Sequence, residues 1–375
     1  MSAYLDHNAT TPLRAGVAAA MADALGDVGN PSSVHRAGRR ARRRVEAARE
    51  QVAGLVGVCA EDVVFTSGGT EANALALRGC GRRRVLVSAV EHDSVMRAVA
   101  GAESIPVDGC GRVDGAVLAS LLAQDDTPAL VSIMLANNET GVIQPVAELV
   151  EVARRFGAWI HCDASQAAGK MPVSVSGLGV DMLTVSAHKL GGPMGVGALI
   201  VASGCELVPF LQGGGQEHGR RAGTENVPGI VGFGLAAELA GADVARLAGL
   251  AEWRDALERR CRALVPECRV FGAAAERLVN TSCLSLPGVG SEVQVMALDL
   301  AGVAVSAGSA CSSGKVRASH VLRAMGVTGN EAACAIRVSL GWDSTAEDVD
   351  AFLAAWGALA ARTAAERQGT AVPAA

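Results

Sequence analysis

The stretch Ser186-Ala187-His188-Lys189-Leu190-Gly191-Gly192-Pro193 places a lysine just after an apolar run at residues 180–185. The run predicts a buried strand, and the glycines predict a turn at its end. Burying an ammonium group is costly and lowers the pKa of a lysine. A lysine in this position therefore suits a Schiff base with an aldehyde cofactor, pyridoxal phosphate. Most lysines at strand ends are solvated, so this stretch alone is a weak indication.

A second motif, His161-Cys162-Asp163-Ala164-Ser165-Gln166, follows another short apolar run at residues 156–160. A carboxylate at a strand end, here Asp163, is what a pyridine nitrogen needs to stay protonated, and Gln166 can donate to the ring oxygen. Asp163 could instead be a helix N-cap, and Gln166 a surface amide. Neither alternative explains why both groups precede the lysine strand.

A third motif, Phe65-Thr66-Ser67-Gly68-Gly69-Thr70-Glu71-Ala72-Asn73, combines a strand signal at residues 63–66 with a helical pattern at residues 71–77. A glycine-rich turn that opens a helix presents free N–H groups and the positive end of the helix dipole, which together bind anions. Thr70 can add its hydroxyl. A capping box explains the same residues equally well. A Walker loop is excluded, because no Gly-Lys-Ser/Thr follows.

The chain resembles the NifS/IscS-type cysteine desulfurases of the class V aminotransferase group of pyridoxal phosphate enzymes, and the resemblance covers residues 4–342. Besides the three motifs above, it rests on blocks in a fixed order. These are Tyr4-Leu5-Asp6-His7-Asn8-Ala9-Thr10-Thr11, Gly29-Asn30-Pro31-Ser32-Ser33-Val34-His35, Glu91-His92, Asn137-Asn138-Glu139-Thr140-Gly141, Arg221-Ala222-Gly223-Thr224, Gly308-Ser309-Ala310-Cys311-Ser312 and Ile336-Arg337-Val338-Ser339-Leu340-Gly341.

Apolar runs alternate with helical patterns from about residue 46 to 211, with strands expected at 63–65, 85–87, 130–135, 159–161, 182–185 and 198–201. The alternation predicts an α/β fold with a mostly parallel sheet between helices. A long helical pattern covers residues 227–265, and further strands are expected near 280–286 and 337–340.

The resemblance implies the fold of PLP-dependent transferases (aspartate aminotransferase type I), with a seven-stranded sheet in a large cofactor-binding domain, residues 15–245. Residues 1–14 and 246–375 are expected to form a smaller α+β domain that carries the catalytic cysteine loop. The tail after about residue 367 is expected to be disordered.

The resemblance also implies roles for residues of the site. Lys189 would hold the cofactor and move protons, Asp163 would pair with the ring nitrogen, and Gln166 would donate to the ring oxygen. His92 would stack on the ring and assist proton transfer, although a half-buried loop histidine is the commoner case. The remaining cofactor contacts would fall on the phosphate, from Gly69, Thr70, Ser186, His188 and, across a homodimer interface, Thr224. Arg337 would bind the substrate carboxylate, and Asn138 would orient substrate and ring.

Cys311 decides which reaction is expected. It lies in Ser306-Ala307-Gly308-Ser309-Ala310-Cys311-Ser312-Ser313-Gly314, whose composition predicts a flexible loop, with Lys315 and Arg317 nearby to favour a thiolate. The implied reaction converts L-cysteine to L-alanine and leaves a persulfide on Cys311. The sulfur then passes to an acceptor protein or scaffold, for iron–sulfur clusters, tRNA thiolation or another product.

Other activities are compatible with parts of this pattern. A selenocysteine lyase, or another class V aminotransferase or lyase, shares the cofactor residues, but an aminotransferase does not need Cys311. A nicotinamide enzyme is not expected, because the glycines at residues 191–197 do not have the G-x-G-x-x-G spacing that such an enzyme needs after a strand. A sulfur-binding assembly protein without activity would not need Lys189, Asp163 and Arg337 together.

Composition narrows the class further. The 375 residues are 50% hydrophobic with a net charge of −5, which gives no case for nucleic-acid binding. The ten cysteines contain no C-x-x-C pair, so no metal site is expected. We expect a cytoplasmic protein with reduced thiols, no signal peptide and no membrane span. The basic cluster at residues 39–44 is expected to form a solvated helix face.

Two positions depart from the family pattern. His7 stands where asparagine or tyrosine is common, and Lys315-Val316-Arg317-Ala318-Ser319-His320 replaces an acidic, proline-containing run. The second departure leaves the sulfur acceptor open.

Overall fold

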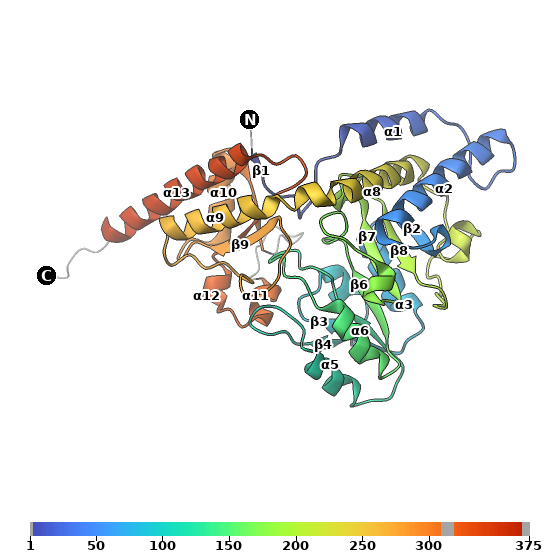
Figure 1. The fold of residues 1–375 in the computed structure, drawn as a ribbon, viewed down its shortest axis with the longest axis horizontal. Helices are drawn as coiled ribbons and strands as arrows, with labels where there is room; N and C mark the ends of the chain where they lie inside the picture. Colours follow the sequence, from blue (N-terminus) through green and yellow to red (C-terminus); the bar gives the residue numbers. More distant parts are fainter. Residues whose placement is uncertain (1–2, 309–318, 370–375) are drawn as a thin grey trace.

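A seven-stranded sheet forms the centre of the larger part of the molecule (Figure 1). The computed structural model describes residues 3–308 and 319–369. The strand order is β2-β8-β7-β6-β5-β3-β4, and the strands β4, β3, β5, β6 and β7 are parallel, whereas β8 is antiparallel to both of its neighbours. The predicted mostly parallel sheet is therefore confirmed. The bounds are β2 (Val63–Thr66), β3 (Arg84–Ser88), β4 (Glu103–Ile105), β5 (Ala129–Ser132), β6 (Trp159–Asp163), β7 (Met182–Ser186) and β8 (Gly197–Val201).

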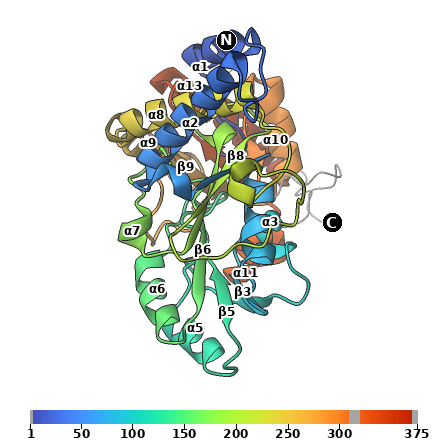
Figure 2. The same cartoon turned by 90° about the vertical axis from the view of Figure 1, so that its right-hand side faces the viewer.

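Helices cover both faces of this sheet, as the alternating pattern predicts (Figure 2). On one face, α3 (Gly69–Gly79) and α4 (Asp93–Met96) share a core with β2, β3, β5, β7 and β8. The opposite face carries a larger core, to which several helices contribute. They are α1 (Ala15–Leu25), α2 (Arg36–Val56), α5 (Gly115–Leu122), α6 (Val146–Arg154), α7 (Val175–Leu178) and α8 (Val227–Leu247).

A second, smaller group of elements has its own core at the other end of the molecule (Figure 1). Its antiparallel sheet has the order β11-β12-β9, and the N-terminal strand β1 pairs in parallel with β10. The predicted division at residues 14/15 and 245/246 stays a prediction. The strands are β1 (Ala3–Tyr4), β9 (Thr281–Ser285), β10 (Val303–Ala304), β11 (Ser306–Ala307) and β12 (Ala335–Ser339). The helices that contribute to this core are α9 (Leu250–Leu264), α10 (Ser291–Leu300) and α13 (Ala346–Gly369). The short helices α11 (His320–Ala324) and α12 (Gly329–Ala332) belong to a separate apolar cluster that includes Val90 and Met134.

The helical pattern over residues 227–265 forms two helices rather than one. α8 ends at Leu247 and α9 begins at Leu250, with Gly249 at the N-cap of α9, and the two helices follow one another across the molecule (Figure 1). The length and apolar composition of α8 would suffice for a membrane span, so the expectation that no apolar run reaches that length is wrong. In this fold α8 packs against α1 and α2 and buries Phe233 in the large core, as core helices do.

Three smaller differences concern boundaries. The strand expected at residues 130–135 ends at Ser132, but Ile133 and Leu135 continue to donate backbone hydrogen bonds to the neighbouring chain segment at His161 and Asp163. The three-residue strand β4 was not predicted, because only Ile105 of it is buried. The helix α13 extends to Gly369, beyond the residue where a disordered tail was expected, and residues 370–375 lie outside the described part of the chain.

Candidate active site

A cavity of about 400 Å³ lies where β6 and β7 end and α3 begins. Parallel strands place the residues that follow their carboxyl ends at one edge of the sheet, which is where ligands bind in such folds. Most of the predicted site residues line this one cavity. They are Gly69, Thr70, His92, Asn138, Asp163, Gln166, Ser186, His188, Lys189 and Arg337.

Lys189 lies at the end of the short 3₁₀ helix η2 (Ala187–Lys189), directly after β7. Its Nζ donates hydrogen bonds to the backbone carbonyls of Asn8 and Ala9, the latter at 2.7 Å. Burial, aided by the positive charge of Arg337, lowers the pKa of Lys189 to about 8. About a tenth of this amine is therefore uncharged at pH 7, far more than for a lysine in water, and the uncharged amine is the attacking form.

Asp163 is the last residue of β6 and is 7% exposed. Its Oδ2 accepts a hydrogen bond from Asn73 Nδ2 of α3 at 2.8 Å, and its Oδ1 accepts one from the backbone of Ser165 at 2.9 Å. These contacts fix the carboxylate plane at the wall of the cavity. The sequence analysis did not predict that Asn73 contacts Asp163, because a single asparagine within a helical pattern does not indicate which residue it meets.

The glycine-rich turn opens a helix, as predicted, at the N-terminus of α3; its role as an anion site stays a prediction. The 11-residue helix begins at Gly69, and Gly68 before it has φ 151°, a conformation that favours glycine. A Cβ atom added to Gly197 would lie 2.6 Å from the Gly68 carbonyl carbon, so the turn also needs a glycine on β8 beside it. Thr70, Ser186 and His188 line the same cavity as Gly69, the first residue of this helix, whose terminal N–H groups favour anions.

His92 forms the N-cap of α4. Its Nδ1 accepts a hydrogen bond from the backbone of Ser94 at 3.1 Å, so the proton of the neutral ring lies on Nε2. Burial lowers the pKa of His92, and the charge of Asp163 opposes this shift in part. A neutral ring with Nε2–H is the form expected at physiological pH.

Arg337 lies on β12, with 6% of its side chain exposed. Its Nη2 donates to Asp6 Oδ1 at 2.7 Å, and its Nη1 donates to the backbone carbonyl of Asn138 at 3.0 Å. Among the residues that the structure describes, none accepts a hydrogen bond from the buried Nε. A buried guanidinium with a free donor at the edge of the cavity is suited to a carboxylate.

Gln166 and Glu139 complete the polar lining. Gln166 Nε2 donates to the Asn8 carbonyl at 2.9 Å. Glu139, in the motif at residues 137–141, is buried and accepts a hydrogen bond from the Ser319 hydroxyl. Burial raises the pKa of Glu139 to about 7, so it is largely protonated at slightly acidic pH. Sequence reasoning assigned no role to Glu139 or to Asn8, although both stand in the quoted motifs.

Two predicted site residues are not found in this cavity. Thr224 lines a separate cavity of about 120 Å³ with Arg221, Glu217 and Thr66, so this single chain does not bring it to Lys189. Cys311 lies outside the described residues. Gly308, directly before its segment, and His320, the second described residue after it, both line the main cavity.

The other nine cysteines give a useful contrast. None of them lines the main cavity, and all are free thiols. Most are buried, as predicted, and burial raises the pKa of Cys268 and of Cys205 to about 11. Cys59 is the exposed one among these nine. In the described residues no cluster of His, Cys, Asp and Glu could hold a metal ion.

Comparison with known proteins extends these observations. The family model Aminotransferase class-V matches residues 3–352. A cysteine desulfurase of Cereibacter sphaeroides is 46% identical to this chain over 366 residues, with 93% of each covered. An IscS-like cysteine desulfurase of Mycobacterium tuberculosis is 40% identical over 373 residues, with 94% of each covered.

Solved structures agree with these relatives. A NifS-like protein from Rickettsia africae has a TM-score of 0.89 and 35% identity, covering 96% of this chain and 99% of its own. A protein solved as SspA in complex with cysteine has a TM-score of 0.77 and 28% identity, covering 91% of this chain and 99% of its own. The resemblance and the fold class predicted from the motifs are thereby confirmed.

Proposed function

The chain belongs to the aminotransferase class-V family of pyridoxal phosphate enzymes, and from that premise we propose that it is a cysteine desulfurase. The observation that carries the proposal is the convergence of Lys189, Asp163 and Arg337 on one cavity. Each residue alone has an ordinary structural explanation. Together they supply an amine, a carboxylate and a carboxylate-binding guanidinium, which an amino-acid substrate and an aldehyde cofactor require.

The residues of the cavity fit pyridoxal phosphate. Lys189 has the burial and lowered pKa of a Schiff-base lysine, and the α3 N-terminus with Thr70, Ser186 and His188 suits a phosphate. Asp163 would contact the ring nitrogen, Gln166 the ring oxygen and His92 the ring face. When bound, the cofactor supplies an electron sink for charge that develops at the substrate Cα.

The chain's own groups would do the rest. Arg337, with the adjacent Asn138 segment, would orient L-cysteine through its carboxylate. Lys189 would take the Cα proton and return a proton to carbon. The Cys311 thiolate would attack the substrate sulfur, the C–S bond would break with its electrons left on carbon, and the products would be L-alanine and a Cys311 persulfide. A further acceptor thiol would then take this sulfur.

A selenocysteine lyase, or another class V aminotransferase or lyase, is the alternative, because these enzymes share the cofactor residues. The relatives named above are cysteine desulfurases, which favours the first assignment. The cytoplasmic location and the identity of the acceptor protein or scaffold stay predictions.

Absorbance spectroscopy of the purified, cofactor-loaded protein tests the proposal. We expect a visible Schiff-base band that Lys189→Ala abolishes. With dithiothreitol present to reduce the persulfide and release its sulfur as sulfide, we expect alanine and sulfide to form from L-cysteine in equal amounts. A colourless protein that takes up no pyridoxal phosphate would refute the cofactor assignment. A coloured protein that produces no alanine from cysteine would instead favour the aminotransferase alternative.

We also propose a homodimer in which Thr224 of one chain completes the phosphate site of the other. Thr224 does not reach the cavity of its own chain, and its loop carries exposed apolar side chains at Val208, Phe210 and Leu211. The backbone of Ala222 donates to Leu211, which ties the two ends of that loop together. An exposed apolar loop of this kind is typical of a subunit interface.

Subunit mixing tests the dimer. Lys189→Ala and Thr224→Ala proteins, each weak in cofactor binding at limiting pyridoxal phosphate, should regain binding when they are mixed, unfolded and refolded together. In a mixed dimer, one site would combine an intact Lys189 with an intact Thr224. No recovery on mixing would show that Thr224 acts within its own chain or not at all.

A further inference from the structure

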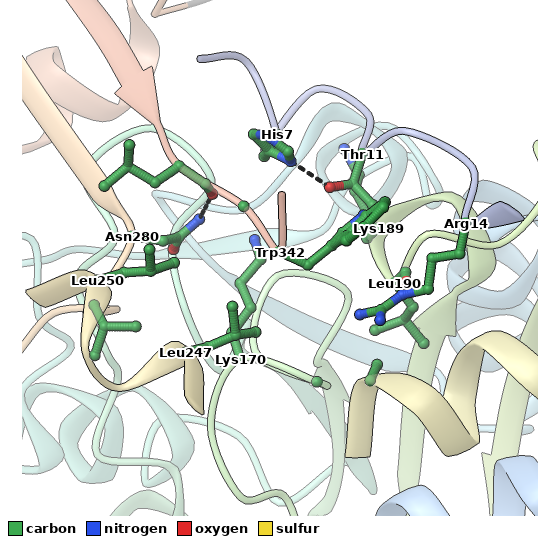
Figure 3. Close-up of a pocket in the computed structure, with 15 residues that line it drawn as sticks. His7, Thr11, Arg14, Lys170, Lys189, Leu190, Leu247, Leu250, Asn280 and Trp342 are labelled. Atoms are coloured by element: carbon green, nitrogen blue, oxygen red, sulfur yellow. Dashed lines mark hydrogen bonds between the residues drawn. The ribbon is translucent and has the colours of Figure 1, made fainter. Parts of the chain in front are cut away.

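A second lysine, Lys170, stands behind the site and has no assigned role. It follows Gln166 by four residues and lines a small cavity of about 30 Å³ together with Lys189, His7 and Asn280 (Figure 3). Its Nζ donates to Gln166 Oε1 at 2.8 Å and to Asn8 Oδ1 at 2.8 Å. Among the described residues, Lys170 is thus hydrogen-bonded to two amides that line the main cavity.

The hydrogen bonds around Lys170 determine how both amides are oriented. Gln166 Nε2 donates to the backbone carbonyl of Asn8, which can only accept, so Gln166 Oε1 must face Lys170. Asn8 Nδ2 donates to the backbone carbonyl of Asn138 at 3.2 Å, so Asn8 Oδ1 also faces Lys170. A lysine amine has at least two N–H groups in either protonation state and can serve both oxygens.

We infer that Lys170 is a positioning residue, which holds the Gln166 amide so that its NH₂ group faces the cofactor's ring oxygen. This inference rests on the proposed function. One N–H of Nε2 is used by the Asn8 carbonyl, and the other is left for an oxygen in the cavity that Gln166 lines. If the Gln166 amide were rotated by about 180° so that its oxygen and NH₂ group changed places, Oε1 would face a ring oxygen that carries negative charge, and the two oxygens would repel each other.

Burial makes this orientation matter. Gln166 is 6% exposed, so without Lys170 its Oε1 would lose its partner in a place that water reaches poorly. Turning the amide would then lose only the hydrogen bond to the Asn8 carbonyl, whereas with Lys170 present it loses both hydrogen bonds. The charged groups that face this region are Lys189, Arg337, Asp6 and Asp163, and the His7 ring also faces Lys170. Among the described residues, Lys170 is the donor that reaches Gln166 Oε1.

The pH titration of the visible band in the cofactor-loaded enzyme tests this inference. Loss of a hydrogen bond to the charged ring oxygen raises the proton affinity of the ring oxygen and Schiff base. We expect Lys170→Met and Gln166→Ala each to raise the pH midpoint of the titration by about one unit, which is a tenfold increase in the proton affinity of the Schiff base. The double variant should move it no further than Gln166→Ala alone, because Lys170 acts through Gln166.

Asn280→Ala is the matched control. Asn280 Nδ2 donates to the same Asn8 Oδ1 at 3.1 Å but does not contact Gln166. We expect this variant to lower the melting temperature while keeping the wild-type midpoint. If Lys170→Met does not fold, Lys170→Gln is tested in its place. A glutamine side chain can donate or accept, so it allows either orientation of the Gln166 amide, and the same upward shift is expected.

Two results would overturn the inference. Lys170→Met, or the glutamine variant, could titrate like the wild type while losing stability as Asn280→Ala does, which would make Lys170 a structural clamp. Alternatively, the full shift could persist in the Gln166→Ala background, which would assign the effect to the lysine charge. A wild-type protein that binds no cofactor would refute the proposed function instead, so the two failures are distinct.

Discussion

The guanidinium of Arg337 donates to Asp6 Oδ1 at 2.7 Å, so the residue predicted to bind the substrate carboxylate is itself held by a carboxylate of the N-terminal segment. Asp6 also accepts a hydrogen bond from the Ser306 hydroxyl at 2.8 Å. The pair joins the N-terminal segment to β12 and holds the guanidinium at the cavity, where its buried Nε has no acceptor in the described part of the chain.

This geometry predicts the effect of Arg337→Lys. Lysine keeps the charge but cannot make a two-pronged contact, so we expect KM for L-cysteine to rise about 10- to 100-fold, with a smaller change in kcat. Steady-state kinetics of alanine release measures both constants, and the visible band of the variant should be intact. An unchanged KM would show that the carboxylate binds elsewhere.

Much of this site could be predicted from sequence because its residues follow strand ends. Asp163 and Lys189 end or follow β6 and β7, and a parallel sheet brings such positions to one edge. The motif at residues 65–73 placed Gly69 and Thr70 at a helix N-terminus for a similar local reason.

The contacts that support these residues could not be predicted in this way. Asn73 meets Asp163 across 90 residues of sequence, and Asn8 meets Asn280 across 272. Such pairs depend on how helices and the N-terminal segment pack, for which a single polar residue in a helix gives no local pattern. Thr224 is a different case, because its predicted role needs a second chain.

A second prediction concerns the pH dependence of cofactor uptake by the apoprotein. The uncharged amine of Lys189 is the nucleophile, and its pKa is lowered to about 8 by burial and by Arg337. We expect the rate of Schiff-base formation to rise with pH and to reach half its maximum near pH 8. Stopped-flow absorbance at several pH values measures this rate.

Two variants with opposite charge effects sharpen that experiment. Arg337→Gln removes a positive charge that lowers the pKa of Lys189, so the midpoint should move upward. Asp6→Asn removes a negative charge that raises this pKa, so the midpoint should move downward. Midpoints that do not respond to either change would contradict the electrostatic explanation.

Glu139 gives a prediction about stability. Burial raises its pKa in the folded protein from 4.5 to about 7, so folding favours the protonated form. Its contribution to stability is complete below about pH 4.5 and is lost as pH rises through 7. Glu139→Gln removes this loss, and we expect the variant to gain up to about 3 kcal/mol of unfolding free energy at pH 8 and nothing at pH 4.

Urea unfolding at a series of pH values measures this difference, and Glu71 provides a control of opposite sign. Burial raises the pKa of Glu71, but hydrogen bonds from Arg221 and Ser67 more than offset this, so its pKa is lowered overall. Glu71→Gln should therefore lose stability at neutral pH, and the loss should shrink in acid. A Glu139→Gln variant that is less stable than the wild type at pH 8 would argue that the charged form is preferred.

The final prediction concerns Cys311, which only the sequence assigns. Cys311→Ala should keep the visible band and its change on adding cysteine, because those steps use Lys189, Asp163 and Arg337. Formation of alanine and sulfide should fall about 10³-fold or more, as expected for loss of a nucleophile. The nine other cysteines do not line the cavity, so none of them is placed to substitute.

Cys59→Ala, which removes an exposed thiol, should retain full turnover. An alkylating probe added after cysteine should label a persulfide on the Cys311 peptide; a label on another cysteine, or normal turnover by Cys311→Ala, would make this protein a different pyridoxal phosphate lyase.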